Sequence, residues 1–141
     1  MATILQIMNG DRNLSLFNKG IKSSGLETKL SELGPFTILG PVNLALGKLM
    51  SLSYDQLLEP ANSDKLLGFL SAYIIAGKKM HSDFRNGQKL NTLDGTEITV
   101  IARDNDVLIN GARILSRDRQ GSNGVIHLLD TTYSKVLAPL T

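Results

Sequence analysis

Apolar residues recur with one period in the first part of the chain and with another in the second. Up to about residue 85 they lie three or four positions apart, as in Leu14, Phe17 and Ile21, which share one helical face. From about residue 88 the period becomes two, and Ile98 and Val100 alternate with polar neighbours as in a half-buried strand. We therefore expect an α+β architecture, with short helices first and a β meander second, rather than βαβ units.

Capping and helix-breaking residues give the expected bounds of the helices. Gly25 is a typical helix stop, and Gly34-Pro35 ends the helix that follows it. Ser53 and Gln56 have capping-box spacing, and Asn43 is a residue type that caps helix N-termini. The expected helices cover residues 14–24, 26–33, 44–50, 54–58 and 64–71.

Turn residues organise the expected strands. Residues 36–39 form a short apolar run inside the helical part, which predicts a buried strand that contains Thr37. Asn110-Gly111 predicts a type I′ hairpin turn, which needs positive φ at both residues, between strands 107–109 and 112–115. Asn123-Gly124 is expected to adopt a special turn conformation before the last strand, 125–129, which contains His127.

Composition narrows the class of protein. The 141 residues, 42% of them hydrophobic, predict one domain spanning 1–141. The absence of cysteine excludes disulfides and thiolate-bound metals. Basic and acidic residues number six and six up to residue 70, and nine and seven after it, too even for a nucleic-acid-binding protein. No apolar run approaches the roughly 18 residues of a membrane span, and the first residues do not resemble a secretory signal.

Candidate chemistry is sparse, and we expect no enzyme, no cofactor and no metal. Two isolated histidines do not make a metal site, and His127 is the only candidate general base, more simply interpreted as a buried structural imidazole. Arg113, Arg117 and Arg119 alternate along one expected strand and its exit. They predict either a solvated edge or a positive face for an acidic polysaccharide or small anionic ligand.

Four segments, in order, resemble the fasciclin domain family. Residues 34–46, GPFTILGPVNLAL, are similar to the first family signature, and residues 122–130, SNGVIHLLD, to the second. Between them, residues 92–95, TLDG, and residues 107–112, VLINGA, match further family landmarks. The resemblance, expected to be to a bacterial member, implies short helices packed on a wedge of mainly antiparallel strands. It also implies a non-enzymatic adhesion or matrix-associated module in an extracellular, periplasmic or cell-surface location.

The resemblance also implies a partner-binding surface and a set of structural residues. The family's Tyr-His pair aligns with Ala72-Tyr73, and its Asp-Ile segment aligns with Asp118-Arg119, so Tyr73 and Arg119 depart from the pattern. The candidate surface for a cell-surface or matrix protein or glycan is residues 73–84 with Arg113, Asp118 and Arg119. The residues expected to have structural roles are Thr37, Asn43, Asn123, Gly124 and His127.

Overall fold

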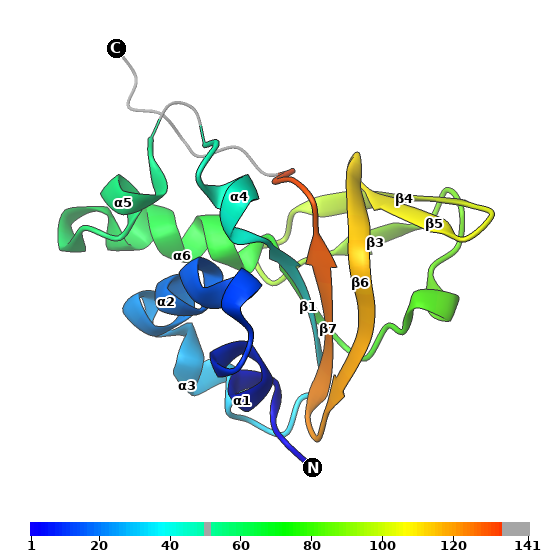
Figure 1. Ribbon diagram of the computed structural model, residues 1–141, viewed down its shortest axis with the longest axis horizontal. Helices are drawn as coiled ribbons and strands as arrows, with labels where there is room; N and C mark the ends of the chain where they lie inside the picture. Colours follow the sequence, from blue (N-terminus) through cyan, green and yellow to red (C-terminus); the bar gives the residue numbers. More distant parts are fainter. Residues whose placement is uncertain (50–51, 134–141) are drawn as a thin grey trace.

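The computed structural model describes residues 1–49 and 52–133, which form a helical layer beside a strongly twisted sheet (Figure 1). The helices are α1 (Ile4–Asn9), α2 (Ser15–Ser24), α3 (Leu26–Leu30), α4 (Asn43–Leu46), α5 (Tyr54–Leu57) and α6 (Ser63–Ser71), with 3-10 turns η1 (Arg12–Leu14), η2 (Pro60–Asn62) and η3 (His81–Asp83). The strands are β1 (Phe36–Pro41), β2 (Ile74–Ala76), β3 (Lys89–Asn91), β4 (Glu97–Arg103), β5 (Asp106–Ile109), β6 (Ala112–Gly121) and β7 (Gly124–Leu129).

The seven strands follow the order β2-β1-β7-β6-β5-β4-β3. Among the strand pairs of the described residues, only β1–β7 is parallel; it runs in register from Phe36 beside Gly124 to Pro41 beside Leu129. The N–H of Leu93, just after β3, donates to the Ile74 carbonyl of β2 at 2.9 Å, so the two ends of the sheet approach each other. The fold is α+β and mainly antiparallel, as predicted.

The β1–β7 pair forms the centre of the molecule, because every residue of both strands is buried. Such close pairing requires a glycine at position 124. A Cβ built there would lie 2.2 Å from the Phe36 carbonyl oxygen, well inside van der Waals contact. Glycine is therefore required at position 124 because there is no room for a side chain.

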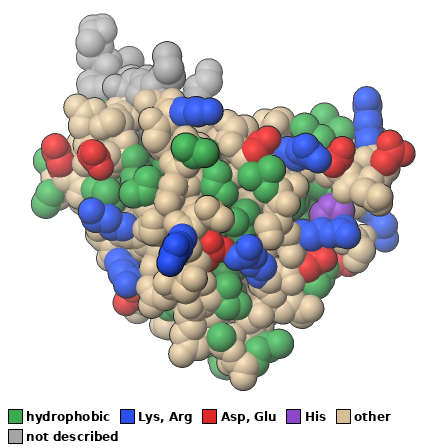
Figure 2. All heavy atoms as spheres, in the orientation of Figure 1, with side chains coloured by type: hydrophobic (Ala, Val, Ile, Leu, Met, Phe, Trp, Pro, Cys, Tyr) green, Lys and Arg blue, Asp and Glu red, His purple; other side chains and the backbone are tan. Residues whose placement is uncertain are grey.

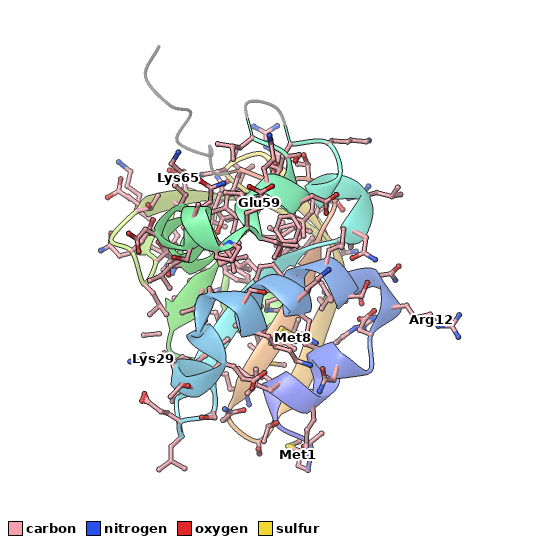
Figure 3. All side chains as sticks on the ribbon, turned by 90° about the vertical axis from the view of Figure 1, so that its left-hand side faces the viewer. Met1, Met8, Arg12, Lys29, Glu59 and Lys65 are labelled. Atoms are coloured by element: carbon pink, nitrogen blue, oxygen red, sulfur yellow. The ribbon has the colours of Figure 1, made fainter. Side chains whose placement is uncertain are left out.

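Apolar faces attach the helical layer to the sheet. Leu14, Phe17 and Ile21 are fully buried along η1 and α2, which confirms the predicted helical face. Met8 of α1 is also fully buried, and its side chain lies between the helices and the sheet (Figure 3). These residues join the side chains of β1 and β7 in one hydrophobic cluster.

Several element bounds differ from the sequence predictions. Helix α3 ends at Leu30, and Leu33 is 93% exposed, because the chain turns out of the helix before Gly34. Helix α4 ends at Leu46 rather than near residue 50, which lies outside the described residues. Helix α1 was not predicted, although Thr3 and Gln6 form a capping box at its start. The type I′ turn is confirmed, with φ of 48° at Asn110 and 88° at Gly111.

Candidate partner-binding surface

Two bulges in β6 shape the surface next to the centre of the sheet. The register shifts between Ile114 and Ser116, and again between Ser116 and Arg119. At the second shift Arg117 and Asp118 together lie opposite His127, and Asp118 has a φ of 59°. A bulge leaves one residue without a partner in the ladder of backbone hydrogen bonds, and here that residue is Asp118.

His127 supplies the hydrogen bond that this bulge leaves open. Its ring is fully buried, its Nδ1 accepts from the Asp118 N–H at 3.2 Å, and its Nε2 lies 2.7 Å from the Lys79 carbonyl oxygen. A carbonyl only accepts, so Nε2 carries the proton and the imidazole is neutral. Burial lowers the pKa of His127, with Asp118 acting in the opposite direction. The ring joins the bulge to the segment that contains Lys79, which fits a structural role.

Residues 77–84, hereafter loop 77–84, lie along the outside of the bulge. The His81 N–H donates to Asp118 Oδ1 at 2.7 Å, and Arg117 Nη1 lies 2.7 Å from His81 Nδ1. A guanidinium only donates, so this Nδ1 is an acceptor and His81 is also neutral. Partial burial and the nearby Arg117 charge lower the pKa of His81.

Side chains make most of the attachments of this loop. Thr37, fully buried in β1, donates through Oγ1 to the Gly77 carbonyl at 2.7 Å and accepts from the Lys79 N–H at 2.8 Å. Lys78 Nζ donates to Gln120 Oε1 of β6 at 2.8 Å. Among the described residues, no hydrogen bond between two backbone groups joins residues 78–84 to the remainder of the chain.

The loop and the bulge together present a polar, partly basic surface, which we call the loop–bulge surface. Figure 2 shows a histidine among basic and acidic side chains on the face that it presents. The members are exposed or half-buried side chains from two segments about 40 residues apart. They are Lys78, Lys79, His81, Arg117, Asp118 and Gln120.

Tyr73 does not belong to this surface, which corrects its sequence-based assignment. Its side chain is fully buried, and its ring centroid lies 4.3 Å from that of Tyr133 and 5.4 Å from that of Phe69. Its hydroxyl accepts from the Tyr133 N–H at 2.9 Å. The apolar neighbours Ala72, Ile74 and Ile75 are the sequence signal that could have indicated a core position.

The three arginines of β6 do not share a face, so the predicted positive face is wrong. The bulges interrupt the alternation on which it depended. Arg113 forms an exposed ion pair with Asp106 at 3.2 Å, whereas Arg117 meets His81. Arg119 pairs instead with Asp11, whose side chain is only 7% exposed, at the boundary with the helical layer. Of these three arginines, Arg117 is the one that bonds loop 77–84, through His81.

Two asparagines have structural contacts other than those predicted. Asn43 does not cap α4; its Oδ1 accepts from the Leu16 N–H of α2 at 3.0 Å, and its Nδ2 donates to the Arg12 carbonyl. Neither Asn123 nor Gly124 has a positive φ, so no special turn conformation explains them. Asn123 instead bonds the N–H of Ile4 and the carbonyls of Leu30 and Glu32, and so joins α1 and the end of α3 to the sheet.

A separate groove of about 290 Å³ lies between α4 and β6. It is lined by apolar side chains, two of which are the unusually exposed Leu44 and Leu115. Arg119 is its charged lining residue, and Asn13 and Asn43 add amides. The groove offers an apolar contact beside a cation.

The described residues contain no cluster of three or more histidine, aspartate or glutamate side chains that could hold a metal ion. Within the same part of the chain, no helix has the length and apolar character needed to cross a bilayer.

Comparisons with known proteins match this architecture. The fasciclin domain model matches residues 12–135. The chain belongs to the fasciclin domain family. In the solved structure of a FAS1 domain pair from the insect cell adhesion molecule Fasciclin I, the matching fold has a TM-score of 0.74 and 19% identity, covering 96% of this chain and 53% of that one.

Sequence relatives of this fasciclin domain come from bacteria and animals. Protein sll1483 of Synechocystis is 34% identical over 128 residues, covering 91% of this chain and 71% of the relative. Transforming growth factor-beta-induced protein ig-h3 of Sus scrofa is 25% identical, covering 93% and 19%. The cell surface glycolipoprotein MPT83 of Mycobacterium tuberculosis is 31% identical, covering 70% and 43%. The chain thus spans less than half of the length of the last two.

Proposed function

We propose that this fasciclin domain is a non-enzymatic adhesion module that binds a protein or glycan of a cell surface or matrix through the loop–bulge surface. Family membership supports the class of function, because relatives include a cell surface glycolipoprotein and the solved structure is of a cell adhesion molecule. The proposed location is extracellular or at the cell surface.

The observation that carries the choice of surface is the convergence of loop 77–84 and the β6 bulge. Lys78 and Arg117 are exposed, and Asp118 and His81 are half-buried beside them. Mixed charge and hydrogen-bonding groups of this kind support specific polar recognition. The half-buried ring of this surface, that of His81, and the buried ring of His127 beneath it are both held in hydrogen bonds, which fits a binding surface better than a catalytic base.

The test is binding of the purified, labelled domain to cells and matrix from its own environment. We expect saturable binding that Arg117→Ala weakens by at least about tenfold, the effect of losing one charged contact. Arg113→Ala is the matched control, because Arg113 is an exposed arginine of the same strand that pairs with Asp106 instead. Equal loss in both variants, or no loss in either with the fold intact, would reject the loop–bulge surface.

Raising the salt concentration in the same assay distinguishes a protein partner from an acidic polysaccharide. Binding to an acidic polysaccharide rests on exposed charge, so it should be lost when salt is raised to about 0.5 M. Binding that persists there favours a protein partner with a partly buried interface.

The groove between α4 and β6 supports a second candidate function, binding of a small ligand. Its lining of apolar side chains, together with Arg119 in its pair with Asp11, fits a small apolar molecule that carries a hydrogen-bond acceptor such as a carboxylate. Titration with decanoate, followed by NMR, should shift signals of Leu44 and Leu115 and saturate. Leu44→Gln should weaken that binding, whereas Leu67→Gln on α6, an exposed leucine away from the groove, should not. Shifts that remain linear with concentration would reject this ligand class.

A further inference from the structure

The rings of His81 and His127 lie between loop 77–84 and the β6 bulge, and each ring makes one hydrogen bond that exists only while the ring is neutral. His81 Nδ1 accepts from the Arg117 guanidinium, and His127 Nδ1 accepts from the Asp118 N–H. A proton added at either Nδ1 replaces an acceptor with a donor that faces another donor. At His81 it also places an imidazolium beside a guanidinium. Protonation of His81 therefore removes a bond that holds the loop. Protonation of His127 removes the bond to the bulge beneath the loop, while its Nε2–H still donates to the Lys79 carbonyl.

The charges around the two rings do not cancel this effect. His81 faces Arg117 and Asp118 of β6 and Asp106 of β5, and Asp106 is itself paired with Arg113. The groups facing His127 are Asp118, His81 and Arg117, with the Phe84 ring packed at 5.6 Å. The loop itself carries Lys78, Lys79 and Asp83. Burial is the largest cause of the lowered pKa of both rings; at His127 the bond to the Lys79 carbonyl opposes it most, and the nearby carboxylates oppose it at both rings.

The other attachments of the loop are weak enough for this change to matter. Loop 77–84 has one buried apolar side chain, Phe84, at its end. At its start, the Gly77 N–H donates to the Pro35 carbonyl. Its remaining bonds run through Thr37, through Lys78, through the His81 N–H to Asp118, and through the two histidine rings. Opening residues 78–83 would thus break side-chain hydrogen bonds and leave every strand pair of the sheet intact.

We infer that loop 77–84 is a latch that protons release: it is closed on the β6 bulge at neutral pH and opens as the pH falls below about 6.5, the ordinary range of histidine. Because the loop forms half of the loop–bulge surface, partner binding should weaken in acid. This second statement rests on the proposed function, whereas the opening itself does not.

The direction of the pH effect follows from which state of the loop, closed or open, binds more protons. The pKa of each histidine is lowered in the closed state, so the open state takes up more protons as the pH falls. The closed state is fully favoured above the ordinary histidine pKa and loses its advantage below it. Between the ordinary and the lowered pKa, each histidine reduces the closed-to-open ratio by about tenfold per pH unit.

Amide hydrogen exchange measured by NMR tests the opening directly. Protection factors, corrected for the intrinsic effect of pH, should fall at the Lys79 and His81 amides between pH 7.5 and pH 5.5, by up to about tenfold per pH unit for each histidine. The Leu39 and Ile126 amides of the central strands should keep theirs. Constant protection of Lys79 and His81 over this range would overturn the latch.

Variants assign the effect to the histidines. His81→Gln keeps an acceptor for Arg117 that does not titrate, so the response of the loop to pH should shrink by about tenfold per pH unit. Lys29→Ala, on α3 in the helical layer that faces the viewer in Figure 3, should respond as the unmodified protein does. A full response in His81→Gln would exclude His81, and an unchanged His127 ring signal at pH 5.5 would then overturn the proposal.

Binding measured at both pH values separates the two proposals. Weaker binding at pH 5.5, with the loop open, supports both. A domain that binds no cell or matrix preparation at either pH, but whose loop opens, rejects the proposed function and leaves the latch standing. Binding that is equal at both pH values while the loop opens overturns the link between them.

Discussion

The helical layer and loop 77–84 are attached to the same sheet by different forces. Fully buried side chains such as Leu14, Phe17 and Ile21 attach the helices, each contributing about 1.5–3 kcal/mol of burial free energy. The loop depends on side-chain hydrogen bonds, each worth about 0.5–1.5 kcal/mol net. This domain therefore combines a permanent interface, between the helices and the sheet, with a detachable one at loop 77–84, and the two histidines lie at the second.

Gly124→Ala should have the largest effect on stability, because it disturbs the β1–β7 pair to which both the helical layer and loop 77–84 are attached. The new methyl group would collide with the Phe36 carbonyl, so β1 and β7 must separate and both attachments lose their support. We expect a loss of about 3 kcal/mol in the free energy of unfolding, the upper end for overpacking a core. Urea denaturation followed by circular dichroism measures it.

Gly68→Ala is the matched control for this change. Gly68 is exposed on α6, and a Cβ there would meet no atom within 4 Å. Because alanine favours the helix, this variant should be as stable as the unmodified protein or gain about 0.5–1 kcal/mol. Equal destabilisation in both variants would contradict the collision at Gly124.

Asn123→Ala should weaken the permanent interface. It removes the acceptor for the Ile4 N–H and the donors to the Leu30 and Glu32 carbonyls, at a residue that is itself buried. Leaving such groups without partners should cost about 2 kcal/mol, with the loss seen in global unfolding. Asn123→Asp is the control, because it keeps the acceptor for the Ile4 N–H and loses only the donors. A loss in Asn123→Ala as small as that of a surface substitution would contradict this role.

Thr37→Val should have the smallest global effect and a clear local one. The isosteric change removes the hydroxyl that bonds Gly77 and Lys79, and water can reach these half-buried backbone groups. We expect a loss of about 1 kcal/mol and faster hydrogen exchange at the Lys79 amide, with α2 unaffected. Faster exchange throughout α2 would show that loop and helices are not separate units.

Local patterns predicted much of the fold, because its determinants lie close together in sequence. The spacing of Leu14, Phe17 and Ile21 sufficed for α2, and Asn110-Gly111 sufficed for its hairpin. The length of β6 was underestimated, because bulges at Leu115 and Asp118 break the period of two. No local signal encodes where a bulge will fall.

The candidate site was less accessible to sequence reasoning, because its contacts join residues far apart. The bonds from Asp118 to His81 and to His127 depend on how β6 and loop 77–84 come together. The capping chemistry of Asn43 was of the right kind, but the helix that it serves is α2, which precedes it by many residues. Tyr73 was misplaced because its alignment with a family motif outweighed its apolar neighbours.

The near-closure of the sheet has a consequence for crowding. Exposed strand edges invite strands from neighbouring molecules, and aggregation begins with such pairing. Here both outer strands, β2 and β3, are three residues long, and the Leu93 N–H already occupies the Ile74 carbonyl. Many copies of the domain could therefore lie close together without pairing their edge strands, and contacts between the copies would be made by side chains.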